Sequence, residues 1–219
     1  MASRPARTDR RESDRNGSLC RSTGAPTSPH PDTVGDALPA AQTQENPVQI
    51  RDAGVADLEA LTEIHNHAVV HTTAIWNEDP VDVDDRAAWL GERSCDGFPV
   101  IVATDDTGVL GYASFGRWRP HSGFRHTVEH SVYVREGQHG RGIGRTLMTE
   151  LIERARAQGV HVMVAAVESG NAASVALHEK LGFVEVGRMP QVGAKFGRWL
   201  DLTFLQLTLD ERAIPAPAS

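Results

Sequence analysis

The stretch TVEHSVYVREGQHGRGIG, residues 127–144, decides the fold prediction. Residues 127–134 have the pattern of a strand, with apolar side chains at alternating positions. The glycine loop His139-Gly140-Arg141-Gly142-Ile143-Gly144 follows, and the next segment has apolar residues at helical spacing, at Leu147, Leu151 and Ile152. The order of strand, glycine loop and helix predicts backbone N–H groups gathered at a helix N-terminus, which is a favourable site for a pyrophosphate.

A glycine loop of this kind has other interpretations. The string alone is equally typical of an ordinary tight turn. A Walker loop is excluded, because no Gly-Lys-Ser or Gly-Lys-Thr follows. A dinucleotide-binding fingerprint is disfavoured, because the acidic residue expected about twenty positions later is missing.

Patterns on both sides of this stretch predict a mixed domain. Upstream, the sequence predicts a strand at 48–51 and two helices at 57–64 and 83–93, the second capped by Asp82. A hairpin of two strands is then predicted at 99–103 and 109–115. Downstream, after the helix, it predicts a strand, a short helix and a strand pair, at residues 162–167, 172–180 and up to Leu209. This order predicts an α+β (mixed α/β) fold rather than a doubly wound one, because no crossovers separate the strands that follow the first helices.

Composition defines the domain and its ends. The chain has 219 residues, 40% of them hydrophobic and 23% charged, which fits one globular domain with a substantial core. Residues 1–45 hold few large apolar side chains, so we expect a disordered extension there. An organelle transit peptide is the alternative, which acidic residues among the arginines disfavour. We expect the folded domain at residues 46–210 and a flexible tail at 211–219.

Several classes of protein are disfavoured by composition. No apolar run approaches the roughly 18 residues of a spanning helix, and no secretion signal is visible, so we expect a cytoplasmic protein without a membrane partner. The net charge is −7 and no basic block occurs, so we expect no nucleic-acid partner. Only Cys20 and Cys95 are present and the histidines are scattered, so we expect no metal.

Several separate motifs resemble the GNAT superfamily of acetyltransferases. Val132-Tyr133-Val134, the loop ending at Gly144, and NAASVALHEKLGF at 171–183 look like its acetyl-CoA site. Three further segments resemble the phosphinothricin and methionine sulfoximine or sulfone acetyltransferases: HTTAIW at 71–76, GFRHTVEHSVYV at 123–134 and QVGAKFGRW at 191–199. The resemblance spans about residues 50–209. It implies a central, mostly antiparallel twisted sheet flanked by helices, acetyl-CoA as cosubstrate, and a homodimer.

The resemblance also implies a cofactor site. The strand is expected to splay from its neighbour, so that backbone groups of Val132, Tyr133 and Val134 meet the pantetheine arm. The pyrophosphate and the rest of the cofactor would then contact His139, Gly140, Arg141, Gly142, Ile143, Gly144, Arg145, Asn171 and Ser174. One departure is His139, which stands where the family usually has Gln or Arg. Asn171 is also expected to be an ordinary helix N-cap.

Two residues are candidates for the catalytic steps. Acetylation of an ammonium group requires a base, and Glu129 lies in a strand with apolar neighbours that would raise its pKa. Alternation alone is also compatible with a solvated glutamate, and the family motif favours the base. His178 is a candidate acid for the departing thiolate, since its ordinary pKa is about 6.5. A surface or capping histidine is the alternative.

The acceptor is expected to be a small amino-acid analogue. Arginine grips carboxylates through paired hydrogen bonds, and the resemblance favours Arg119 in this role, although a surface arginine pair is the alternative. Further substrate contacts are expected from Trp76, Arg117, Pro120, His121, Phe124, Glu129, His130, Ser131 and Lys195. We expect acetylation of the α-amine of methionine sulfone, methionine sulfoximine or phosphinothricin, and hence detoxification or resistance. The alternatives are a peptide N-terminus or another small amine, or a non-catalytic acyl-CoA sensor that has no need of Glu129.

Overall fold

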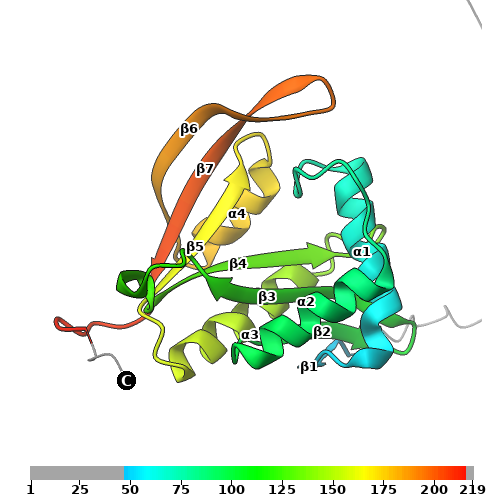
Figure 1. The fold of residues 1–219 in the computed structure, drawn as a ribbon, viewed down its shortest axis with the longest axis horizontal. Coiled ribbons are helices and arrows are strands. Elements are labelled where there is room, and N and C mark those ends of the chain that lie inside the picture. The colour runs from blue at the N-terminus through cyan, green and yellow to red at the C-terminus, as the bar shows by residue number, and fades with distance from the viewer. Residues whose placement is uncertain (1–46, 216–219) are drawn as a thin grey trace, which may run out of the picture. The chain divides into compact units, whose positions relative to one another are not determined.

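Seven strands form one sheet in the computed structural model, which describes residues 47–215 (Figure 1). The spatial order is β1-β2-β3-β4-β5-β7-β6, and every neighbouring pair is antiparallel except β4 and β5. The strands are β1 (Gln49–Asp52), β2 (Val100–Asp105), β3 (Gly108–Arg117), β4 (Thr127–Val134), β5 (Val162–Glu168), β6 (Val184–Lys195) and β7 (Arg198–Thr208). The mixed, mostly antiparallel sheet predicted from the sequence is therefore confirmed.

Helices pack on both faces of this sheet. They are α1 (Leu58–His71), α2 (Val83–Cys95), α3 (Ile143–Ala157) and α4 (Ala172–Lys180), with short 3-10 turns η1 (Val55–Asp57) and η2 (Ser122–Phe124). Ile101 of β2 packs with Leu147 of α3 on one face, and Val102 packs with Leu61 of α1 on the other. The strand β2 is therefore apolar at consecutive positions instead of alternating, because both of its faces are covered.

A tight hairpin joins β2 to β3 where the sequence predicts it. Asp105 pairs with Gly108, so only Asp106 and Thr107 form the turn. The Asp105 carboxylate accepts the Thr107 N–H at 2.9 Å, and Gly108 has a φ of 117°, a conformation that favours glycine.

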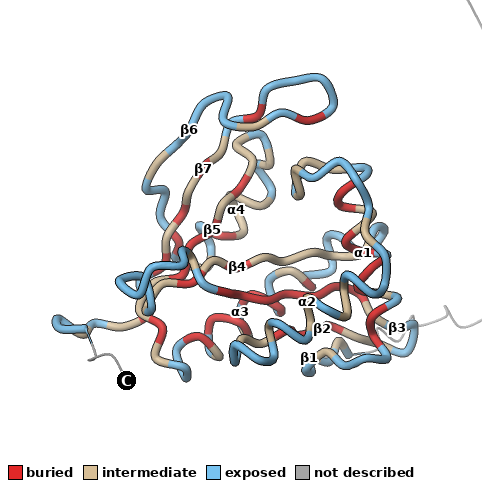
Figure 2. The backbone as a smooth tube through the Cα atoms, in the orientation of Figure 1, coloured by how far each residue is buried: buried red, intermediate tan, exposed pale blue. Residues whose placement is uncertain are grey.

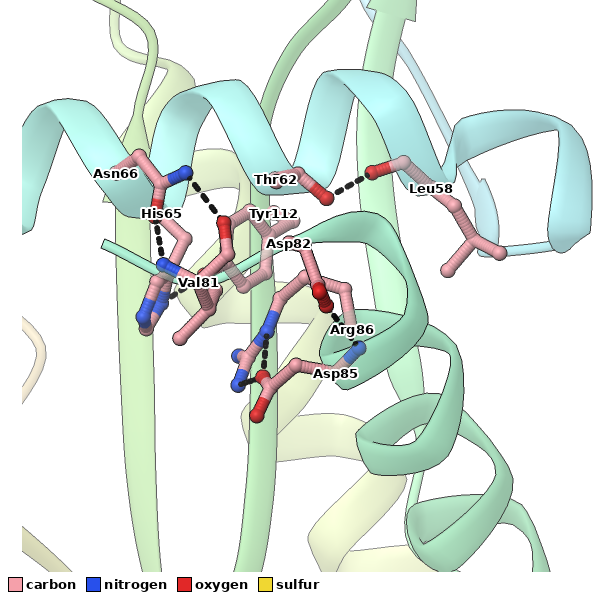
Figure 3. Close-up of polar contacts among 9 residues, drawn as sticks. All are labelled: Leu58, Thr62, His65, Asn66, Val81, Asp82, Asp85, Arg86 and Tyr112. Atoms are coloured by element: carbon pink, nitrogen blue, oxygen red, sulfur yellow. Dashed lines mark hydrogen bonds and ion pairs between the residues drawn. The ribbon is translucent and has the colours of Figure 1, made fainter. Parts of the chain in front are cut away.

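Side chains of α1 hold the connection to α2 in place (Figure 3). The Asn66 amide donates to the Val81 carbonyl at 2.8 Å and accepts the Val81 N–H at 2.9 Å. Asp82 then caps α2 as predicted, by accepting the Asp85 N–H at 2.8 Å. On the inner side of α1, the buried His65 Nδ1 lies 3.4 Å from the Tyr112 hydroxyl of β3. These contacts fix the segment between the two helices, which forms part of the wall of the site described below.

The parallel strands β4 and β5 separate shortly after they meet. They pair only over Thr127–Glu129 and Val162–Val164, although β4 continues to Val134 and β5 to Glu168. The expected splay of β4 from its neighbour is therefore present. Beyond Glu129, one edge of β4 has no partner strand.

Two helices extend beyond their predicted ends. The first runs to His71 instead of Ile64, and the second runs to Cys95 instead of Arg93. The flexible tail at 211–219 stays a prediction. Within it, Arg212 donates to the Gly159 carbonyl at 2.6 Å and pairs with Asp210 at 2.6 Å. The predicted extension at residues 1–45 lies outside the described residues. Within residues 47–215, no helix has the length and apolar character that a membrane span requires.

Candidate active site

A cleft of about 350 Å³ opens where β4 and β5 separate. Its lining comes from strands β3, β4 and β5, from α4, and from single residues of α2 and the segment after α1. These residues are Ala74, Arg93, Gly116, Arg117, Glu129, His130, Ser131, Val132, Tyr133, Ala165, Ala166, Val167, Asn171, Ser174 and His178. Most of the predicted catalytic and pantetheine-arm residues are thus brought together in one place.

Glu129 occupies the point at which the two strands part. Burial raises the pKa of its carboxyl group, and the cations Arg119 and Arg93 oppose that shift. Within the described residues, no hydrogen bond or ion pair engages this half-buried carboxylate. A partly desolvated carboxylate without a partner is suited to accept a proton from a ligand.

The unpaired edge of β4 and the start of α4 face each other across the cleft. Ser131, Val132 and Tyr133 line it from β4, and Asn171 and Ser174 line it from α4. The Asn171 carboxamide oxygen accepts the Ser174 N–H at 3.1 Å, so the predicted N-cap role is confirmed. The edge of a strand that lacks a partner suits an extended ligand with amide groups, because backbone groups need hydrogen bonds.

Two buried imidazoles connect β4 to α4. His178 Nδ1 lies 2.6 Å from the Ser174 carbonyl oxygen, so it carries the proton of the neutral ring. His178 Nε2 must then accept from His130 Nε2, 3.1 Å away, which leaves the buried His130 Nδ1 without a hydrogen-bond partner. The rings also stack, with their centroids 5.0 Å apart.

Both histidines line the cleft, so their predicted roles, a substrate contact for His130 and the acid for His178, stay predictions. In the neutral ring the His178 proton points to a backbone carbonyl, and burial lowers the pKa of His178. The His130 side chain packs against His178 and Phe183, on the opposite face of β4 from Glu129. Both residues therefore hold the two walls of the cleft together.

The glycine loop lies outside the cleft lining, at the start of the 15-residue helix α3. Gly140 and Gly142 have φ values of 81° and 79°, and a Cβ on either would meet no atom within 4 Å, so backbone conformation explains these two glycines. Ile143 is buried, which leaves only its backbone for a ligand. Arg141 pairs with Asp105 at 3.1 Å, whereas His139 and Arg145 are exposed. The loop retains the backbone geometry of an anion site.

Lys195 is a predicted substrate contact, but in this structure its ammonium group is engaged by the protein itself. The side chain is buried, and its ammonium group donates to the carbonyls of Val69, Thr72 and Ile75. An ammonium group has three N–H donors, so none remains for a substrate. Lys195 instead attaches β6 to the end of α1.

Two predicted aromatic contacts also lie outside the cleft lining. The Trp76 ring packs on Gly193 of β6, where an added Cβ would come within 2.2 Å of it, and its indole N–H donates to the Thr73 carbonyl at 2.9 Å. Phe124 lines a separate groove with Trp118 and Phe204. Substrate contact by these two rings stays a prediction, and in this structure tertiary packing places them outside the cleft lining.

Of the two arginines predicted for the carboxylate site, only Arg117 lines the cleft. Arg117 lines the cleft and pairs with Asp96 at 3.5 Å. Arg119 is exposed, with its guanidinium 3.9 Å from the centroid of the Trp118 ring, and Pro120 and His121 are exposed beside it. Arg93 lines the cleft but was missed, since nothing in its sequence position distinguishes it from a basic residue in the last turn of a helix.

The chemistry available in the cleft combines one partnerless carboxylate, two guanidinium groups and an open strand edge. Within the described residues, no group of three His, Cys, Asp or Glu side chains has the arrangement of a metal site. This set of groups is suited to take a proton from an amine and to hold an anionic group beside it.

Comparisons with known proteins agree with this geometry. A model described as the acetyltransferase (GNAT) family matches residues 59–183. An L-methionine sulfoximine/L-methionine sulfone acetyltransferase from Pseudomonas aeruginosa is 66% identical over 74% of this chain and 94% of its own. A phosphinothricin N-acetyltransferase from Alcaligenes faecalis is 41% identical over 70% of this chain and 79% of its own. The structure of an acetyltransferase from Salmonella typhimurium with its cofactor acetyl-CoA covers 79% of this chain and all of that chain, with 57% identity and a TM-score of 0.77.

The position of Lys195 leads to a prediction about stability. Lys195→Met removes three charge-assisted hydrogen bonds, so it should lower the free energy of unfolding by about 3 kcal/mol, measured by urea denaturation. The exposed Lys180→Met is the matched control and should leave stability unchanged. Unchanged stability in Lys195→Met together with weaker acceptor binding would restore the predicted substrate contact.

Buried neutral histidines predict that the fold is less stable in mild acid. Burial lowers the pKa of His130 to about 3 and that of His65 to about 4. Unfolded histidines bind protons below about pH 6.5, whereas these native rings stay neutral, so stability falls as the pH drops.

From pH 7 to pH 5, His130 alone should contribute a loss of about 2 kcal/mol, measured from urea unfolding curves at each pH. His65→Met should reduce the slope of stability against pH, whereas the exposed His121→Gln should not change it. A flat profile over this range would contradict the neutral state of the buried rings.

Proposed function

The chain belongs to the acetyltransferase (GNAT) family, and we propose that it transfers the acetyl group of acetyl-CoA to the α-amine of a small amino-acid analogue. The observation that carries this proposal is the partnerless Glu129 carboxylate, held at the parting of β4 and β5 with a raised pKa. A protein that only binds acyl-CoA has no use for such a group.

Glu129 acts as the base in this reaction. Near neutral pH the acceptor arrives as an ammonium ion, which has no lone pair for attack on a thioester. Glu129 takes one proton from it, directly or through one water, and the burial that raises the carboxyl pKa makes it a better proton acceptor. The freed amine attacks the thioester carbonyl, the C–N bond forms and the C–S bond breaks. The second proton lost by the nitrogen neutralises the departing CoA thiolate, and the proton held by Glu129 passes to solvent.

The open edge of β4 and the glycine loop are the surfaces proposed for acetyl-CoA. Acetyl-CoA supplies the activated acetyl group as a thioester. Backbone groups of Val132, Tyr133 and Val134 would hold its amide-bearing arm, with Asn171 and Ser174 opposite. The backbone of 139–144 and the first turn of α3 would hold the pyrophosphate, with Arg141 and Arg145 near it.

The acceptors proposed are methionine sulfone, methionine sulfoximine and phosphinothricin, in line with the names of the relatives. All three are free amino-acid analogues, and the cleft has the size and the cationic groups that suit such a molecule. Acetylation removes the charge of the amine, so the protein would serve detoxification or resistance, and we expect it to act in the cytoplasm.

Substitution of Glu129 tests the proposed reaction. Glu129→Gln should lower turnover about 100-fold or more with little change in acetyl-CoA affinity, because only the proton acceptor is lost. Release of CoA thiol is measured over methionine sulfone, methionine sulfoximine, phosphinothricin, common amino acids and short peptides. Glu153→Gln, at an exposed ion pair of α3, is the control. Unchanged turnover in Glu129→Gln would show that Glu129 is not the base. A preference for peptides would favour a peptide N-terminus as the acceptor.

A homodimer is the proposed assembly, and exposed apolar side chains of β6 and β7 support it. They include Val184 (61%), Val186 (56%) and Trp199 (67%), and Figure 2 shows how exposed β6 is along its length. Large apolar side chains on a surface are typical of a protein interface. A second copy of the chain packed against these two strands would bury such side chains.

Dimer formation is tested by a charge on the β6–β7 hairpin. Trp199→Glu should weaken self-association on the order of 30-fold, because it places a charge in an apolar interface, and sedimentation velocity over a concentration series measures this. Val55→Glu, at an exposed apolar residue of η1, is the control and should sediment like the parent. A parent protein that stays monomeric throughout would contradict the homodimer.

A further inference from the structure

The Arg93 guanidinium reaches the cleft through a space left by a glycine. Arg93 lies in the last turn of α2, and a Cβ on Gly116 of β3 would fall 1.3 Å from its Nη1. Any other residue at 116 would therefore displace the guanidinium. The close approach of this side chain to the backbone brings a cation from the helix layer to the surface of the sheet.

This cation has no anionic partner within residues 47–215. Its one hydrogen bond there is long, from Nη1 to the Phe115 carbonyl at 3.4 Å, and its guanidinium carbon lies 5.9 Å from the centroid of the Trp89 ring. The side chain is half-buried, and desolvation lowers its pKa. A guanidinium that is withdrawn from water and has unused N–H donors is a strong site for an anion.

The neighbouring arginines differ from Arg93 in this respect. Arg117 has a carboxylate partner, Asp96, and its side chain is 64% exposed. Arg119 is exposed on the loop after β3 and stacks on Trp118. Arg119 lowers the pKa of Glu129 through its charge, so it contributes to the field in the cleft, but its side chain is exposed to solvent. An anion bound by Arg93 loses less to competition with solvent.

The location of Arg93 relative to Glu129 indicates which anion would bind. Gly116 and Glu129 are direct partners in the β3–β4 register, so the cation over Gly116 lies beside the base. Arg93 also acts on the pKa of Glu129 by its charge. A free α-amino acid has an ammonium group and a carboxylate on one carbon, which matches a carboxylate and a guanidinium side by side.

We propose that Arg93 binds the α-carboxylate of the acceptor while Glu129 receives the proton of its α-ammonium group. This rests on the proposed function and names the residue that selects its substrate class. Free amino acids and their analogues satisfy both groups. A peptide N-terminus has a neutral amide in place of the carboxylate and leaves the half-buried cation without an anion, so peptides are rejected.

The test compares two acceptors that differ only in the anion. Methionine sulfone has the α-carboxylate, and its α-carboxamide has the same amine without the charge. Arg93→Met should raise KM for methionine sulfone on the order of 30-fold while the KM for the carboxamide changes little. KM for acetyl-CoA should stay constant. Arg119→Met should have the smaller effect, and Arg156→Met on the surface of α3 should have none.

A pH profile provides a second readout that a purely structural role would not produce. Loss of the cation disfavours the Glu129 carboxylate, so the acid limb of kcat/KM for the carboxamide should move to higher pH in Arg93→Met. If Arg93→Met does not fold, Arg93→Lys retains the charge without the paired donors and should raise KM for methionine sulfone about 10-fold.

The outcomes separate this inference from the proposed function. Calorimetry measures how tightly both acceptors bind in the presence of CoA when turnover is prevented by Glu129→Gln. The measurement compares this single variant with the double variant that also contains Arg93→Met. The wild-type protein could acetylate neither acceptor and still bind the carboxylate acceptor more tightly, in a way that depends on Arg93. That result would overturn the proposed acetyl transfer and retain Arg93 as a carboxylate-binding residue. Equal losses for both acceptors, or a carboxylate-selective loss in Arg119→Met alone, would overturn the role of Arg93.

Discussion

The site depends on the early separation of β4 and β5. The two strands are joined over three residue pairs and then part, which is tolerated because β3 still pairs with β4 and β7 with β5 on their outer sides. The gap exposes a strand edge whose backbone groups need partners, and it places Glu129 where the cleft begins. A sheet with full pairing at this point would leave no strand edge and no cleft beside Glu129.

The electrostatics of the cleft are local. The chain has a net charge of −7, yet the cleft contains guanidinium groups from two different elements, α2 and β3. Burial raises the pKa of Glu129 and lowers that of Arg93, so both charges are partly stripped of water, and each opposes the shift of the other. A zwitterionic acceptor would complement both groups at once, which a general positive field does not achieve.

Several residues with the appearance of substrate contacts instead build the walls. Lys195 and Trp76 hold β6 against the segment after α1, and the His130–His178 pair joins β4 to α4. Each has polar groups that are hydrogen-bonded inside the protein. The contacts that join these elements, Lys195 to Thr72, Trp76 to Gly193 and His130 to His178, are distant in sequence, so local patterns do not reveal them.

Sequence by itself determined the features that depend on local spacing. The order of strands and helices, the β2–β3 turn, the Asp82 and Asn171 caps, and Glu129 in its apolar strand all follow from neighbouring residues. Tertiary structure alone decided the role of Arg93, because its proximity to Glu129 requires α2 to cross β3 at a glycine and β3 to pair with β4 in one register. It likewise turned Lys195 and His178 inward, since the partners of a side chain are set by long-range packing, which a one-dimensional pattern does not contain.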